Sequence, residues 1–423
     1  MSLKNQSFVK IRSSSPMSRS TRSTISTRSR YSYDSAYNEA CESYQEYKME
    51  YSPYIGHFEL IEKLCAGGFG VTFKATKRQW SNNNNINTTN TNHKKRLKQN
   101  QKQSRKRKNQ QQNEKTCTKN TNVEKLDTYC IKVFSIRESQ ENEAAQNEVF
   151  KEAQREYNIA KSIQSNNVIK ILSLSQFTVE PKLLNQFRTT WTYTVSPLYQ
   201  TDLFNYHALW MSEHQGFDDK MVATIVTQIC NGLKAMHDKG FIHTDIKLEN
   251  VLVKSIHSQQ LDASCHDIKN ISVCICDLGS VHHMNERIED HGRTNQFSSP
   301  EVLCYIGHLV NAKSDVFSLG CLLFMLCTSV DLFDDDNTYT ILALQRHYSI
   351  SDHMKEVVAS RYFHRSGCIK YNMDIEMASK ALWYDVLSPY IHKTFIQMIQ
   401  ACLECDNAKR CDINFILDHL KQI

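Results

Sequence analysis

A stretch in the first third of the chain, residues 79–122, restricts where a folded core can form. It consists mainly of Asn, Gln, Lys and Thr, with runs such as Ser81-Asn82-Asn83-Asn84-Asn85. It has too few apolar side chains to offset the entropy of ordering its backbone. Strand-like sequence lies on both sides of it, from Phe58 to Lys77 and from Tyr129 to Phe134. We therefore expect residues 79–122 to loop out of a folded unit as a disordered insert.

A second region without a core lies at the N-terminus. Residues 11–30 are almost entirely Ser, Thr and Arg. Such a segment cannot bury enough apolar surface to fold. We expect residues 1–56 to form a disordered tail that can be phosphorylated.

The rest of the chain divides into a strand-rich and a helix-rich half. Strand patterns dominate up to residue 198, apart from one helix expected at 143–164. Apolar residues at helical spacing then predict helices at 218–237, 314–328 and 390–403. This order favours an α+β fold with two lobes and a cleft between them. The predicted domains are a small β-rich N-lobe (57–198) and a larger α-helical C-lobe (199–423).

Charge is distributed very unevenly. The chain has 51 Lys and Arg against 45 Asp and Glu, a net charge of +6. Residues 1–33 carry seven basic residues and residues 94–108 carry nine, with no acidic residue in either stretch. These 16 leave 35 basic against 45 acidic residues elsewhere, so two basic segments are attached to an acidic body. An acidic body favours basic protein substrates.

Cysteines and apolar runs indicate the environment. Fifteen cysteines, and an N-terminus without an apolar signal region, predict reduced thiols inside the cell. Cys402-x-x-Cys405 and Cys274-x-Cys276 lack a second pair at zinc-finger spacing, so we expect buried structural thiols rather than a metal site. The longest apolar run, 316–327, is shorter than the ~20 residues that cross a bilayer. It predicts a buried helix and no membrane contact.

A glycine-bearing turn begins the chemically informative sequence. Leu64-Cys65-Ala66-Gly67-Gly68-Phe69-Gly70-Val71-Thr72 lies between two expected strands. Its glycines let backbone N–H groups approach a polyphosphate, although an ordinary glycine hairpin would have the same sequence. Lys132 lies on a later strand, and Glu156 follows on the expected helix. Hairpin, strand lysine and helix glutamate occur in the order of the protein-kinase signature.

The clearest signal lies in the second half. His243-Thr244-Asp245-Ile246-Lys247-Leu248-Glu249-Asn250 is followed, 27 residues after Asn250, by Asp277-Leu278-Gly279. Phosphoryl transfer needs a carboxylate to orient a hydroxyl, a cation near the transferred group, and a carboxylate plus an amide oxygen to hold Mg²⁺. Asp245, Lys247, Asp277 and Asn250 supply these groups. Turn formation alone would explain either motif, but not both in this order.

With these motifs, residues 57–423 resemble the eukaryotic protein kinases. The resemblance implies ATP and Mg²⁺ as cofactors, with Lys132 on the α/β-phosphates and paired with Glu156. It implies that Asp245 is the catalytic base and that Lys247 contacts the γ-phosphate. Asn250 and Asp277 would hold the metal. The nucleotide-binding residues implied in the glycine turn are Leu64, Gly67, Gly68 and Gly70.

Further parts of the same resemblance concern the adenine site and the supports of the catalytic loop. Val195-Ser196-Pro197-Leu198 falls where the hinge is expected, with Val195 as gatekeeper and Leu198 as the backbone donor to adenine, because proline has no N–H. Thr72, Cys130 and Leu252 would enclose the adenine ring. Glu301 would pair with Arg410, and Asp315 would brace the catalytic loop.

A narrower resemblance is to the LAMMER-type dual-specificity kinases of the CMGC group, which act on Ser/Arg-rich splicing proteins. Thr244 stands where most kinases have arginine, as in that family. A long insertion at 255–270, a late segment at 352–367 and the block 403–410 are also similar. The chain departs from the kinase pattern at Cys65, which replaces a glycine, and at Leu278, which replaces a phenylalanine. It is similar to a divergent member of this group.

Two alternatives stay open. One is a pseudokinase or scaffold, since a kinase-like fold does not by itself imply catalysis. The other assigns function to the basic run 94–108, which is a solvated insert, a bipartite nuclear-import signal or a nucleic-acid-binding segment. Direct nucleic-acid binding is disfavoured because no aromatic residue interrupts the run.

The sequence-based prediction is thus a monomeric serine/threonine kinase, with tyrosine left open as a second acceptor. Its predicted substrates are basic or Arg/Ser-rich proteins, and its predicted location is nuclear, cytoplasmic or both. Because Thr244 replaces the arginine that commonly binds a phosphorylated activation loop, we also predict activity that does not require activation-loop phosphorylation.

Overall fold

The computed structural model describes eleven segments of the chain. They are residues 54–67, 70–77, 127–134, 143–179, 189–213, 216–255, 271–284, 286, 294–303, 310–333 and 391–423. The predictions for most of the N-terminal tail, for the insert 79–122, for the insertion 255–270 beyond Ser255 and for the late segment 352–367 lie outside the described residues.

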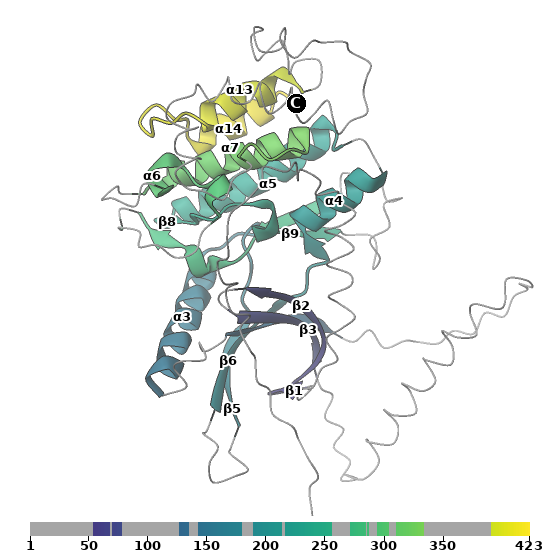
Figure 1. The fold of residues 1–423 in the computed structure, drawn as a ribbon, viewed down its shortest axis with the longest axis vertical. Helices are drawn as coiled ribbons and strands as arrows, with labels where there is room; N and C mark the ends of the chain where they lie inside the picture. The colour runs from purple at the N-terminus through teal and green to yellow at the C-terminus, as the bar shows by residue number, and fades with distance from the viewer. Residues whose placement is uncertain are drawn as a thin grey trace, which may run out of the picture.

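The N-lobe is built on one antiparallel sheet of six strands. In spatial order these are β1 (Tyr54–Ile55), β2 (Phe58–Gly67), β3 (Gly70–Lys77), β4 (Thr128–Phe134), β6 (Thr189–Pro197) and β5 (Ser173–Val179). Alternating residues along the strands bury one face, where Ala75, Ile131, Val133 and Val195 join a common apolar cluster. Helix α3 (Glu143–Ser162) lies beside this sheet and reaches toward the other lobe (Figure 1).

The C-lobe is mainly helical. The helices in the described part of this lobe are α4 (Leu203–Glu213), α5 (Asp219–His237), α6 (Pro300–Leu303), α7 (Ala312–Thr328), α13 (Lys393–Cys402) and α14 (Ile413–Leu420). Asp218 caps α5 by accepting a hydrogen bond from the Met221 N–H at 2.7 Å, which fixes where the predicted helix begins. Helix α7 is buried on nearly all sides, as expected for a helix that is apolar around its circumference.

Two small sheets lie where the lobes meet. One has the order β10 (Ile271–Ile275), β9 (Val251–Ser255), β7 (Thr201–Asp202), and the other pairs β8 (Phe241–Ile242) with β11 (His282–His283). The ends of the two motifs found in the sequence form short 3-10 turns, namely η3 (Leu248–Asn250) and η5 (Leu278–Ser280). A further 3-10 turn, η6 (Asn295–Phe297), precedes α6.

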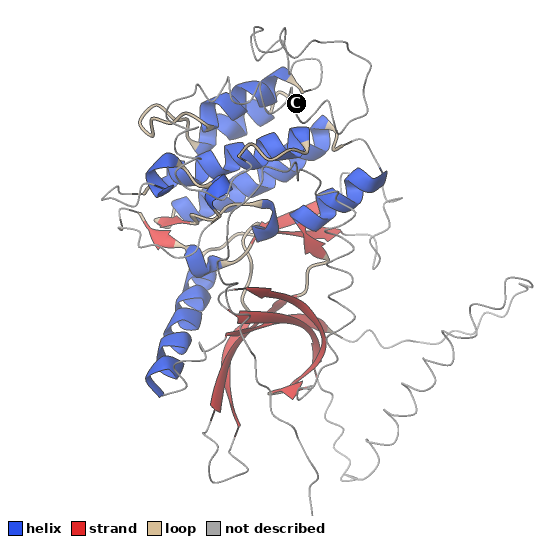
Figure 2. Ribbon diagram, in the orientation of Figure 1, coloured by secondary structure: helices blue, strands red, loops and turns tan. Residues whose placement is uncertain are grey.

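Strands and helices therefore segregate into two lobes (Figure 2). This confirms the predicted α+β class and the bilobal arrangement. The helix expected at 316–327 forms as part of α7 within the C-lobe core. Within the described residues, none of the helices combines the length and the apolar character needed to cross a membrane.

Candidate active site between the two lobes

The glycine hairpin between β2 and β3 forms as predicted. Gly67 pairs with Gly70 at its tip, while Gly68 lies outside the described residues. Gly70 has a φ of 149°, and a Cβ placed on it would lie 2.1 Å from the Val133 carbonyl oxygen on β4. Only glycine fits there, because a side chain would collide with neighbouring backbone. The close approach of β3 to β4 also places Thr72 opposite Lys132.

Lys132 binds two carboxylates, one from each lobe. Its Nζ donates to both Glu156 oxygens at 2.9 and 3.0 Å, and to Asp277 Oδ1 at 3.3 Å. Glu156 is buried on α3, whereas Asp277 follows β10. Burial alone would lower the pKa of Lys132, but the charges of Glu156 and Asp277 outweigh it and raise that pKa. The ammonium therefore stays charged at neutral pH.

Asp245 is held from several sides. Its Oδ2 lies 3.0 Å from Lys247 Nζ and accepts a hydrogen bond from Asn250 Nδ2 at 2.8 Å. Its Oδ1 accepts from the Thr294 N–H at 3.3 Å, and Lys247 Nζ also donates to Thr294 Oγ1 at 2.5 Å. Burial would raise the pKa of Asp245, but the Lys247 charge and these hydrogen bonds lower it on balance. The carboxylate is ionised and fixed in orientation.

A second, fully buried carboxylate supports the backbone of the catalytic loop. Asp315, in the first turn of α7, accepts from the N–H groups of His243 at 2.9 Å and Thr244 at 2.8 Å. Its Oδ2 also lies 2.8 Å from His237 Nε2 at the end of α5. The geometry matches the role that the kinase resemblance implies for Asp315. His237 is an additional support that sequence reasoning missed.

Thr244 connects the catalytic loop to the segment after Asp277. Its φ of 65° is uncommon for a β-branched residue. The Thr244 hydroxyl donates to the Ser280 carbonyl oxygen at 2.7 Å. Arg155 on α3 contacts the same segment, because its guanidinium donates to the carbonyl oxygens of Gly279, at 3.4 Å, and Val281. The sequence analysis did not assign Arg155, Ser280 or Thr294 to the site. For Arg155, its position next to Glu156 is the feature of the sequence that could have indicated it.

The metal-binding prediction can be tested against the donor atoms. Asn250 Nδ2 donates to both the carbonyl oxygen and the Oδ2 of Asp245. The side-chain atom with which Asn250 could bind a cation is therefore its amide oxygen. The Cys276 N–H donates to the Asn250 carbonyl oxygen at 2.9 Å, which brings Asp277 next to Asn250. Among the described residues, no group of three His, Cys, Asp or Glu side chains could hold a metal alone. One carboxylate plus one amide oxygen fits Mg²⁺, which is commonly completed by substrate phosphates and water.

Strand pairing shows which face of the sheet each residue of the predicted adenine site occupies. Cys130 pairs with Ser196, and Lys132 with Thr194, so these four residues share one face of the sheet. Val195 instead pairs with Ile131 and is buried with it in the N-lobe core. This contradicts the prediction that Val195 is the gatekeeper. Thr194 and Ser196, on either side of Val195, lie on the face that carries Lys132.

The remaining adenine-site residues lie near this face. Leu252 on β9 alternates with the core residues Val251 and Val253, so it is directed away from the C-lobe core. Leu198, just after β6, and Leu64, on β2, are both half-buried. Burial raises the pKa of the Cys130 thiol to about 11, so Cys130 contributes a neutral surface.

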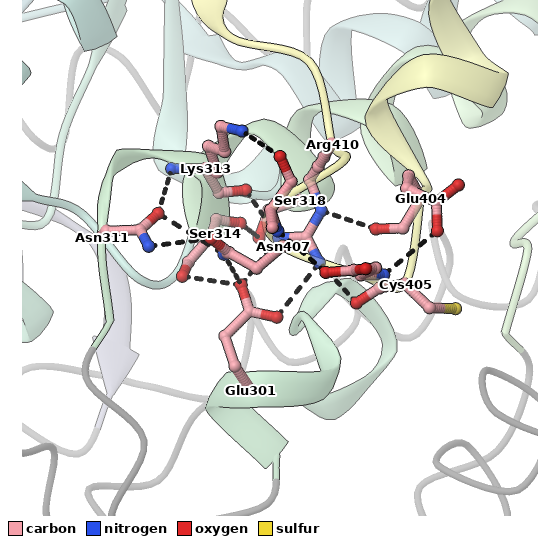
Figure 3. Close-up of polar contacts among 11 residues, drawn as sticks. Glu301, Asn311, Lys313, Ser314, Ser318, Glu404, Cys405, Asn407 and Arg410 are labelled. Atoms are coloured by element: carbon pink, nitrogen blue, oxygen red, sulfur yellow. Dashed lines mark hydrogen bonds and ion pairs between the residues drawn. The ribbon is translucent and has the colours of Figure 1, made fainter.

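The predicted pair of Glu301 and Arg410 forms the centre of a polar network in the C-lobe (Figure 3). Arg410 NH1 and NH2 lie 2.6 and 3.1 Å from the two oxygens of Glu301. Arg410 also donates to the carbonyl oxygens of Glu404, Lys313 and Cys405. Burial would raise the pKa of Glu301, but the bonds and charge of Arg410 lower it to about 2. The network ties α6 to α7 and to the loop before α14.

Comparison with known proteins agrees with this geometry. The family model described as protein kinase domain matches residues 113–420, well over half of the chain. The chain therefore belongs to the protein kinase domain family. The family implies protein substrates and the use of ATP with a divalent metal.

Individual relatives are distant. The chain is 26% identical over 233 residues to serine/threonine-protein kinase AFC3 of Arabidopsis thaliana, covering 49% of this chain and 58% of the relative. It is 29% identical over 189 residues to human mitogen-activated protein kinase 13, covering 44% and 45%. It is 24% identical over 276 residues to mitogen-activated protein kinase pmk-2 of Caenorhabditis elegans, covering 64% and 61%. The chain thus spans roughly half the length of the curated relatives it matches.

Proposed function

We propose that this chain is an Mg²⁺- and ATP-dependent protein kinase that phosphorylates Ser and Thr in basic protein segments. The observation that carries the proposal is a pair of ionic contact groups. In the first, Lys132 binds Glu156 and Asp277. In the second, Asp245 contacts Lys247 and Asn250. The first group joins a lysine and a glutamate of the N-lobe to an aspartate of the C-lobe, and the second lies in the catalytic loop. A pseudokinase would not need to retain both.

Each group has a distinct task in the proposed reaction. Asp245, kept ionised by Lys247, orients the substrate hydroxyl and accepts its proton. Lys247 places a positive charge beside the same carboxylate, where charge develops on the transferred group. Lys132 positions the nucleotide phosphates, and Asn250 and Asp277 would hold the divalent metal. That metal, when bound, neutralises phosphate charge.

The test is ATP-dependent phosphorylation by the purified chain with Mg²⁺. We expect Asp245→Asn and Lys132→Ala each to lower turnover by about 100-fold or more, because a general base and a phosphate-positioning cation are removed. Lys234→Ala is the matched control, since Lys234 is a lysine on α5 whose largely exposed side chain pairs with the exposed Asp238. Equal turnover in wild type and Asp245→Asn would reject the enzyme and favour the scaffold.

The preference for basic substrates has a local basis as well as the acidic composition. Glu249 lies exposed in the turn that follows Lys247, and Asp202 lies on the neighbouring strand β7. Partial desolvation raises the pKa of Glu249, and the nearby Asp202 and Asp245 carboxylates raise it further. Clustered carboxylates of this kind are stabilised by a cationic partner. An Arg-rich peptide supplies one beside the phosphorylated hydroxyl.

A peptide-array profile tests this preference. We expect Ser and Thr flanked by Arg to be phosphorylated best, and Glu249→Gln to raise KM for Arg-containing peptides by about 3- to 10-fold. KM for a peptide without basic residues should stay unchanged in the same variant. A wild-type profile without basic preference would contradict the proposal, even if kinase activity is present.

Our proposals for the kinase subfamily and for the location in the cell rest on features of the sequence. Thr244 in the catalytic loop and the Ser/Arg-rich tail support a LAMMER-like, divergent kinase with Arg/Ser-rich substrates, and tyrosine autophosphorylation is part of that proposal. The basic run 94–108 supports nuclear entry. Deletion of 94–108 in a fluorescent fusion should reduce nuclear accumulation, and unchanged distribution would remove this role.

A further inference from the structure

Two cysteines at the end of the C-lobe lie in direct contact. Cys402 is the last residue of α13, and Cys411 lies just before Asp412, the N-cap of α14. Their sulfur atoms are 3.8 Å apart. The Cys411 N–H also donates to the Ala401 carbonyl oxygen at 3.2 Å, which holds the two backbone segments together. The sequence spacing drew attention to Cys402 and Cys405, as structural thiols rather than a metal site, whereas in the structure the sulfur of Cys402 contacts that of Cys411.

The two thiols differ in exposure. Cys402 is completely buried, whereas Cys411 is half-buried and can be reached from solvent. The hydrogen bond from Cys402 lowers the pKa of the Cys411 thiol, and the same bond together with burial raises the pKa of Cys402. The more accessible sulfur is therefore also the one that ionises first.

Packing determines which side of the pair can move. A Cβ placed on Gly320 of α7 would lie 2.6 Å from the Cβ of Cys402. Helix α7 therefore packs directly against Cys402 and prevents it from shifting in that direction. Cys411 belongs to the loop before α14, so a small movement of this loop closes the remaining gap between the sulfurs.

We propose that Cys402 and Cys411 form a reversible redox site that reacts with peroxides. The Cys411 thiolate attacks one peroxide oxygen, which gives a sulfenic acid on Cys411 and releases hydroxide that is protonated to water. The Cys402 sulfur then attacks the Cys411 sulfur, forms the disulfide and releases a second water. Two thiols lose two electrons and two protons, and one hydrogen peroxide becomes two waters. The inference does not depend on the proposed kinase activity.

The disulfide would close a ring around residues 403–410. This loop carries Arg410 and Asn407, which both bind Glu301. A crosslink restricts the unfolded chain and leaves these native contacts in place. We expect the oxidised protein to melt roughly 5 °C higher than the reduced protein, on the scale typical of a short disulfide loop.

Peptide mapping of the full-length protein tests the assignment. The protein is treated with stoichiometric hydrogen peroxide, alkylated and digested with trypsin, which cleaves after Lys409 and Arg410 and separates the two cysteines. We expect the fragment with Cys402 to be disulfide-linked to the fragment that begins at Cys411, and dithiothreitol to release it. Cys405→Ser is the matched control, because Cys405 lies in the same loop and should not be needed.

Several outcomes would overturn the proposal. One is loss of the crosslink in Cys405→Ser, which would assign the bond to Cys405. A second is no crosslink at all, with Cys411 only sulfenylated or unmodified. A third is a crosslink that persists in Cys411→Ser. Because Cys411 is half-buried, this variant keeps the core intact and stays folded for the measurement.

Discussion

Replacing Glu301 by glutamine removes one charge from the network around Arg410 while keeping the shape of the side chain. The Glu301 side chain is 11% exposed and that of Arg410 is fully buried, so little solvent screens the pair. The pKa of Glu301 falls from 4.5 to about 2, against the effect of burial, because Arg410 favours its ionised form. At 1.36 kcal/mol per pKa unit, the ionised carboxylate contributes about 3 kcal/mol to folding.

We therefore expect Glu301→Gln to lower the free energy of unfolding by about 3 kcal/mol at pH 7, because Arg410 keeps its buried charge without a counterion. Urea unfolding, followed by tryptophan fluorescence and far-UV circular dichroism, measures this loss. Glu404→Gln is the matched control in the same loop: Arg410 binds only the Glu404 backbone oxygen, and the side chain accepts from the Asp406 N–H. We expect that control to lose less than about 1 kcal/mol.

The same comparison has a defined pH dependence. The folded-state pKa of Glu301 is depressed, so its contribution is fully present above pH 4.5 and disappears as pH falls toward about 2. The stability difference between wild type and Glu301→Gln should shrink over that window. A loss below 1 kcal/mol at pH 7, or a difference that does not change with acid, would refute the assignment of the stabilisation to the ionised carboxylate.

Three further predictions concern the catalytic supports. In Asp315→Asn, an NH₂ group replaces one of the two oxygens that accept hydrogen bonds from the His243 and Thr244 N–H groups, so the catalytic loop loses part of its support. Steady-state kinetics should show kcat about 100-fold lower, with a smaller change in KM. Arg155→Met removes the bonds between α3 and the segment after Asp277, and we expect a several-fold rise in KM for ATP while the melting temperature changes little. Phosphatase treatment should leave most turnover intact, because Thr244 replaces a phosphate-binding arginine. The treatment is repeated on a protein that lacks residues 1–53, so that phosphates on the N-terminal tail play no part. Loss of turnover on phosphatase treatment of this truncated protein would contradict the prediction.

Much of the site could be predicted because its residues lie in short motifs or in a recognisable order of strands and helices. Asp245, Lys247 and Asn250 lie within a span of six residues, and the side chains of Lys247 and Asn250 both contact Asp245 as that spacing suggests. Lys132 and Glu156 were found through the order of strand and helix. Their contact follows from packing of α3 beside the sheet.

Other features of the site depend on contacts between residues far apart in the sequence or on the face of a strand, and only the three-dimensional structure shows them. The prediction placed Val195 on the face of β6 that carries the nucleotide site, and a shift of one residue along a strand exchanges the two faces of the sheet. Local sequence does not show which face Val195 takes, and only its pairing with Ile131 decides it. Thr294 is 49 residues from Asp245, and no local pattern connects such partners. The contact between Cys402 and Cys411 depends in the same way on where the chain returns after α13.

The hydrogen bonds of Thr244 explain why its replacement of arginine need not disable the site. A left-handed conformation costs a β-branched residue of order 1–3 kcal/mol, and such strain persists only where surrounding contacts require it. Here Asp315 holds the Thr244 N–H and Ser280 accepts from its hydroxyl. Asp277, three residues before Ser280, has a φ of 59° and is held by Lys132. The catalytic loop and the segment after Asp277 are therefore joined by a hydrogen bond that involves no phosphate group. This link is the physical reason to expect turnover without activation-loop phosphorylation.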